Sequence, residues 1–182
     1  NGYPYRVAYT LAVTGTAGEG YVVYLPISPE LLNKYAEAVS EDDLYIYEDL
    51  TATMVKANEN GYTVTCFYGA HVIKCGLSRY LIWMMEHGYI THLASNGAGS
   101  IHDFELAYLG GTSEDVPTAI EDGSFGMWEQ TGRWINEALQ KGAKEGWGYG
   151  ESLARYIHEN QEKFPYKDDC VLYRAWLLNI PT

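Results

Sequence analysis

Strand-like and helix-like segments alternate, with short connections, between residues 45 and 110, and this alternation limits the folds open to the chain. Residues 62–68 and 89–94 have the Tyr, Thr, Val and Ile content of strands. The apolar spacing of helices is present in residues 46–60, 77–87 and 101–109. Such alternation is typical of βαβ units on a parallel sheet, so the sequence predicts an α/β fold.

The N-terminal region has a different texture. Two segments rich in Val, Tyr and Thr, 6–14 and 21–25, flank a loop of small residues, which predicts a Tyr-rich β-hairpin. Residues 28–30 (Ser-Pro-Glu) are the types that open a helix. We therefore treat residues 1–40 as a hairpin plus a helix without an assigned role, and residues 41–182 as one domain.

The C-terminal part is predicted to be helical. The expected helices are residues 113–123, 127–144, 149–164 and 168–178. Most of the tryptophans fall here, and we expect them to pack this helical layer onto the sheet. Residues 177–182 resemble the start of a buried strand, so we expect a sheet that is incomplete at the C-terminus, in the N-terminal portion of a longer protein.

Composition excludes several classes. An apolar content of 47% with 20% charged residues excludes intrinsic disorder, and no apolar run approaches the length of a membrane-spanning helix. The net charge of -12 argues against nucleic acid or an anionic membrane as the partner and is compatible with a cationic small molecule. The three cysteines lack the spacing of a metal site and indicate reduced thiols in a cytoplasmic protein, with no metal.

Two strand-to-helix turns are candidate ligand sites. The first is residues 69–76, in which His71 and Lys74 supply polar groups, and the second is the small-residue turn 95–100. Because ligands of open parallel sheets bind outside the carboxyl ends of strands, we predict that the two turns lie side by side and form one crevice. Gly97 would let a phosphate approach the amides of the helix start. The alternatives are a bare structural turn and surface side chains.

A third candidate is the helix start at His102 and Asp103. A histidine and a carboxylate beside the glycine turn would suit proton transfer or a cationic substrate. Asp103 could instead serve only to stabilise the positive end of the helix dipole. The sequence has no GxSxG motif and no serine with a designated base, which argues against a serine hydrolase. Cys75 fits either a reactive thiol beside Lys74 or a small buried residue.

These stretches carry a resemblance to a known family. Residues 68–78 (YGAHVIKCGLS), 91–105 (THLASNGAGSIHDFE) and 110–116 (GGTSEDV) resemble the deoxyhypusine synthase family, most of all its bacterial deoxyhypusine-synthase-like branch. The resemblance extends over about residues 45–182 and leaves out the Tyr-rich N-terminal region. It implies a Rossmann-like domain that binds NAD, in an enzyme that takes hydride from a polyamine and transfers its aminobutyl group through a lysine.

The resemblance also implies site residues. It assigns NAD contacts to Ala70, His71, Ile73 and Lys74 in the first turn, and to Asn96, Gly97 and Ala98 in the second. It assigns the polyamine to His102 and Asp103, although Ile101 and His102 stand where the family has carboxylates. The family's Gly-rich segment with the catalytic lysine has no counterpart in these residues, so no catalytic residue is assigned.

We therefore expect the NAD-binding portion of a deoxyhypusine-synthase-like alkylamine transferase, with a small cationic amine as substrate and a homo-oligomeric assembly. Activity is expected only if the protein continues past residue 182. The alternative is a non-catalytic structural or assembly protein that uses the Tyr-rich N-terminal strands for strand addition to a neighbour's sheet.

Overall fold

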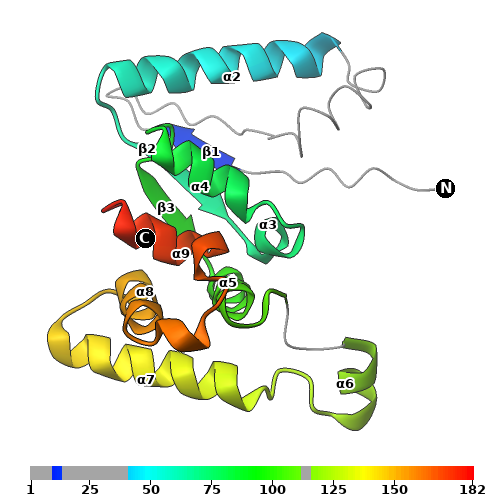
Figure 1. Cartoon of the computed structure of the whole chain (residues 1–182). Helices are drawn as coiled ribbons and strands as arrows, with labels where there is room; N and C mark the ends of the chain where they lie inside the picture. The colour runs from blue at the N-terminus through cyan, green and yellow to red at the C-terminus, as the bar shows by residue number, and fades with distance from the viewer. Residues whose placement is uncertain (1–9, 14–40, 112–115) are drawn as a thin grey trace.

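The computed structural model describes residues 10–13, 41–111 and 116–182, and in that part the chain is a mostly helical α/β protein (Figure 1). The strands are β1 (Thr10–Val13), β2 (Val64–Tyr68) and β3 (His92–Ser95). The helices are α2 (Glu41–Glu59), α3 (Ala70–Lys74), α4 (Ser78–Glu86), α5 (Gly97–Leu109), α6 (Val116–Asp122), α7 (Glu129–Glu145), α8 (Tyr149–Glu159) and α9 (Val171–Leu177). Short 3₁₀ turns, η2 (Gln161–Lys163) and η3 (Lys167–Asp169), join α8 to α9.

The sheet has the order β1-β2-β3 in the described residues. β2 and β3 run parallel, with Tyr68 opposite Ser95, and β1 runs antiparallel to β2. The predicted parallel pair is therefore confirmed. Of the predicted hairpin, only the strand β1 is described; its second strand and the helix expected at residues 28–30 lie outside the described residues.

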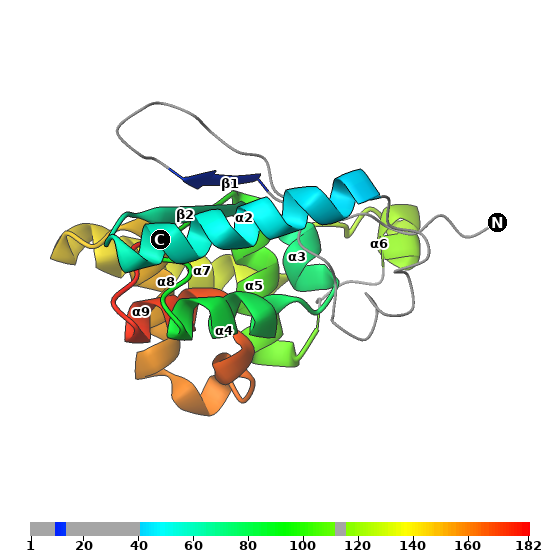
Figure 2. The same ribbon diagram turned by 90° about the horizontal axis from the view of Figure 1, so that it is seen from above.

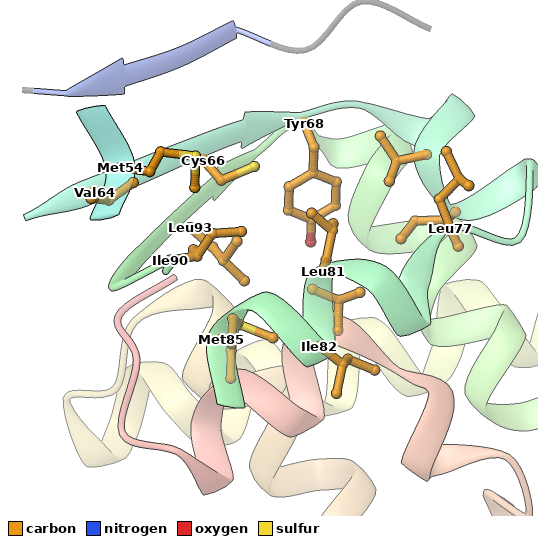
Figure 3. Close-up of a cluster of buried hydrophobic side chains, with 14 of the residues drawn as sticks. Met54, Val64, Cys66, Tyr68, Leu77, Leu81, Ile82, Met85, Ile90 and Leu93 are labelled. Carbon is orange, nitrogen blue, oxygen red and sulfur yellow. The ribbon is translucent and has the colours of Figure 1, made fainter. Parts of the chain in front are cut away.

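Helices cover one face of β2. Val64, Cys66 and Tyr68 alternate along the strand and are buried, whereas Phe67 on the opposite face is 46% exposed. Figure 3 shows the buried side chains meeting Leu81 and Met85 of α4 in the layer between sheet and helices. In Figure 2, β1 lies at the outer border of the described part, away from α4 and α9.

A second core joins the helices. Phe104 of α5 packs edge-on against Phe164, with ring centroids 5.0 Å apart, and Trp134 of α7 packs against the same ring at 5.8 Å. Trp134 and Trp176 pack against this second core, which contains no strand residue, and Trp128 is 40% exposed, so the prediction that the tryptophans pack the helical layer onto the sheet is not confirmed.

α7 and α8 cross at a glycine. A Cβ on Gly142 would overlap the Ser152 side chain and lie 2.7 Å from its Cβ, so only glycine fits this crossing. Gly132 on the same helix has no neighbour within 4 Å of such a Cβ. Packing therefore requires glycine at position 142 of α7 and does not require it at position 132.

The C-terminal residues reach the edge of β3 that no described strand occupies. The Leu93 amide donates to the Pro181 carbonyl at 2.9 Å, and Ile180 packs against the first core. Residues 180–182 lie outside helix and strand, so the start of a buried strand expected there stays a prediction. Within residues 10–13, 41–111 and 116–182, no helix combines the length and apolar character that crossing a membrane requires.

Candidate functional site

The two predicted turns lie side by side. They follow parallel strands whose last residues, Tyr68 and Ser95, are opposite each other. The next residues are also neighbours, since a Cβ on Gly69 would lie 3.8 Å from the Asn96 side-chain nitrogen. The predicted adjacency is confirmed, and α3 and α5 leave the same end of the sheet (Figure 1).

The first turn is a short helix rather than a loop. Ala70 to Lys74 form α3, which starts directly after Gly69. Ile73 is buried in the first core, so it packs against protein and has no surface for a cofactor. Ala70 is half-buried, and His71 and Lys74 are exposed. Of the predicted contacts here, only those three remain open to a ligand.

The second turn is the first turn of α5. This helix begins at Gly97, four residues earlier than the sequence predicts, because the Asn96 side chain accepts the Gly99 amide at 2.9 Å and caps it. Gly99 packs so tightly on the Ser95 side chain that a Cβ would overlap its hydroxyl. The amides of Gly97 and Ala98 precede the helical bonds and have no protein acceptor in the described residues.

A hollow of about 490 Å³ lies beside the start of α5. It is lined by Tyr68, His92, Leu93, Ala94, Ser95, Asn96, Gly97, Ser100, Tyr149, Gly150, Leu172 and Thr182. Asn96 and Gly97 of the predicted contacts line it, whereas α3 does not. The two turns are therefore adjacent, but they do not enclose this hollow together, because its lining includes β3 and the start of α5 and no residue of α3. Among the described residues, no lysine, arginine, aspartate or glutamate side chain lines the hollow, and His92 is its titratable side chain other than the two tyrosines.

Hydroxyl groups order one wall of the hollow. Ser100 donates to the Gly97 carbonyl at 2.9 Å, and its oxygen lies 2.8 Å from the Tyr149 hydroxyl. A serine has one proton, so Tyr149 must be the donor to Ser100. Tyr149 lies 49 residues from Ser100 in the sequence, and the sequence-based prediction did not include it.

Asp103 is placed elsewhere and has another role. It is fully buried, and its carboxylate accepts the amides of Val171 and Leu172 at 2.9 and 2.8 Å and the Cys170 thiol at 3.1 Å. It therefore caps the start of α9, and these contacts account for both oxygens. Burial raises the pKa of the Asp103 carboxyl to about 6, although the three donors oppose the shift.

His102 does not line the hollow either. Its Nδ1 lies 3.7 Å from the carboxylate of Glu105, which is buried and accepts the Thr131 hydroxyl at 3.0 Å. Neither residue of the predicted polyamine pair lines the hollow: Asp103 joins α5 to α9, and His102 faces a buried carboxylate. The contact between Asp103 and the start of α9 spans more than 60 residues and has no local sequence pattern.

The three cysteines are free thiols, with Cys66 and Cys170 buried and Cys75 exposed. Burial raises the pKa of Cys66 to about 12, and it raises the pKa of Cys170 well above its ordinary value together with the charge of Asp103. Both are therefore protonated core residues. Across the described ranges, no group of three or more His, Cys, Asp or Glu side chains is arranged to hold a metal ion.

Comparison with known proteins adds no family: no protein-family model matches the chain, and no curated protein matches its sequence.

Proposed function

We propose that this chain binds an NAD-type dinucleotide as the nucleotide-binding portion of a deoxyhypusine-synthase-like alkylamine transferase. The observation that carries the proposal is the pair of adjacent turns after parallel strands, with the capped start of α5 presenting the Gly97 and Ala98 amides beside a hollow. Amides at a helix start, together with the helix dipole, stabilise a phosphate group. The exposed Lys74 on the neighbouring turn could contact a second phosphate or a ribose.

The Rossmann-like sheet and the transfer reaction rest on the sequence resemblance. The alkylamine part is proposed without a substrate residue, because Asp103 is committed to α9 and His102 faces Glu105. In this proposal a lysine nucleophile comes from outside residues 1–182, because Lys74 is fit only to position a cofactor.

Calorimetric titration of residues 1–182 with NAD tests the binding part. We expect a dissociation constant between about 0.1 and 10 mM, since one of the two half-sites of a dinucleotide fold is present. A spermidine-dependent NADH assay tests the transfer part, and we expect no turnover. An absence of NAD binding at 10 mM would contradict the proposal, and amine-dependent turnover by these residues would contradict the need for an external lysine.

A second candidate is an assembly protein that adds strands to a neighbour's sheet. One observation favours it: β1, from the Tyr-rich region, is the outermost strand of the described sheet and pairs only on its β2 side there. An unpaired edge can accept another chain's strand. Concentration-dependent assembly by light scattering, without NAD binding, would favour this candidate over the first.

A further inference from the structure

The segment from α6 to the start of α7 presents large apolar side chains to solvent. Within residues 117–128, Ala119 is the one buried residue. Four large apolar side chains of this segment are exposed, and we call them the 120–128 patch: Ile120 (63%), Phe125 (53%), Met127 (76%) and Trp128 (40%). Large apolar side chains gathered at one place on a surface are rare in proteins that bind nothing there, so the patch marks an interaction surface.

The patch belongs to one folded-back turn. The Phe125 amide donates to the Ala119 carbonyl at 3.1 Å, which brings residue 125 back beside α6. Gly123 and Gly126 supply the left-handed conformations that this reversal needs, with φ of 77° and 80°. In Figure 1, α6 lies at one end of the described part, beyond the start of α7. The patch therefore stands apart from the two cores, at a place that a partner can reach.

The charges that border the patch are acidic. Residues 106–132 contain five acidic residues and no lysine, arginine or histidine. Glu121 and Asp122 directly follow Ile120 in α6, and both are exposed. Glu129, which follows Trp128, is also exposed and pairs with Arg133 one turn further along α7, at 3.1 Å. The patch is thus an apolar surface with carboxylates at its border.

This charge decides which occupant fits the patch. A second copy of the chain would bring the same acidic border, and with a net charge of -12 on each copy the like charges oppose association. An anionic membrane is disfavoured for the same reason. A helix rich in lysine or arginine, with an apolar stripe, can place the stripe on the patch and its cations against the carboxylates. The flexible Met127 side chain can adapt to such a stripe.

We propose that the 120–128 patch docks a basic amphipathic helix of a partner protein, with Phe125 and Met127 as the apolar contacts and Glu121 and Glu129 as acidic contacts. This surface is separate from the two turns at which we propose nucleotide binding, and the proposal does not depend on that binding.

A fluorescein-labelled synthetic helix of about 15 leucine and lysine residues, with the leucines in one stripe, is the probe. One control peptide has glutamate at every lysine position, and a second has the same composition in an order that breaks the stripe. In fluorescence anisotropy at about 0.1 M salt, the lysine helix should bind with a dissociation constant below about 100 μM, and about tenfold or more tightly than either control.

One pair of variants tests the apolar contacts. Phe125→Ser combined with Met127→Ser should weaken binding of the lysine helix about tenfold or more. Tyr62→Ser is the matched control, because it removes an aromatic side chain of similar exposure, 50%, outside the patch, and it should leave binding unchanged. All three replaced side chains are exposed, so the fold should be kept, which circular dichroism would verify.

A second pair tests the acidic border. Glu121→Gln combined with Glu129→Gln should weaken binding about threefold at low salt and have little effect at about 0.5 M salt. Glu59→Gln combined with Glu145→Gln changes the net charge equally at two exposed positions outside the patch, and should leave binding nearly unchanged.

Two kinds of result would overturn the proposal. The first is no binding of the lysine helix up to about 1 mM, or equal losses in the patch variants and their controls. The second is self-association of the unaltered chain in sedimentation velocity that Phe125→Ser combined with Met127→Ser abolishes, because the occupant would then be a second copy.

Discussion

Replacing Gly142 by alanine should destabilise the protein, although alanine is the better helix former. The substitution gains about 1 kcal/mol of helix propensity in the interior of α7. Its Cβ, however, would lie 2.7 Å from the Cβ of Ser152 across the helix crossing. Rotation of the Ser152 hydroxyl relieves only part of the overlap and breaks its 2.6 Å bond to the Gly148 carbonyl. α7 and α8 must therefore separate.

The net effect follows from comparing these contributions. Overpacking of this kind costs about 1–3 kcal/mol, and the lost hydrogen bond costs about 1 kcal/mol more. After the propensity gain is subtracted, Gly142→Ala should lower the free energy of unfolding by about 1–3 kcal/mol. Gly132→Ala on the same helix, where a Cβ meets nothing within 4 Å, should raise it by about 0.5–1 kcal/mol.

Urea unfolding monitored by tryptophan fluorescence measures both variants at an unchanged m-value. A double-mutant cycle with Ser152→Gly gives the decisive comparison, because the partner side chain is then absent. In that background Gly142→Ala should instead raise the free energy of unfolding by its propensity gain of about 1 kcal/mol, a coupling of about 2–4 kcal/mol. Equal stabilisation by Gly132→Ala and Gly142→Ala would refute the close crossing.

Other predictions concern the buried polar and sulfur groups. In urea unfolding, Asp103→Ala should lower the free energy of unfolding by about 3–5 kcal/mol, because two buried amides of α9 lose their acceptor. A smaller loss would mean that α9 caps its first amides in another way. The folded protein holds the Asp103 proton more tightly than the unfolded chain. The stability of the unaltered protein relative to Asp103→Asn should therefore be greatest below about pH 4 and fall by up to ~3 kcal/mol as the pH rises through 6. A thiol reagent at pH 8 should modify Cys75 at once and Cys66 and Cys170 only on unfolding; rapid reaction of all three would contradict their burial.

The sequence predicts elements well where the pattern is local. The strands β2 and β3 and the helix α4 lie within three residues of their predicted bounds, because composition and apolar spacing mark them directly. The predicted start of α5 is four residues too late because its first four residues are small and suggest a loop, whereas the Asn96 cap makes them helical. Local spacing also gives no way to tell Gly132 from Gly142, since the difference lies in another helix.

The candidate site, too, could be predicted where it depends on the order of strands and not where it depends on long-range contacts. The adjacency of the two turns follows from the order of strands and could be predicted. The role of Asp103 could not, because its partners lie 67–69 residues further along the chain. The burial of Tyr68 could be predicted, because this residue continues the inward-facing alternation of Val64 and Cys66 along β2.

The Asp103 cap also has a consequence for the order in which the molecule assembles. α9 has seven residues, too few for a helix to persist alone in water, and the acceptor for its first amides lies on α5. Bringing α9 to α5 closes a long loop, and this costs chain entropy before the hydrogen bonds to Asp103 form. α9 should therefore form only in molecules whose α5 is already folded. Leu172 takes part in that contact, Thr182 follows it in the chain, and both line the hollow, so the hollow is completed among the last steps of folding.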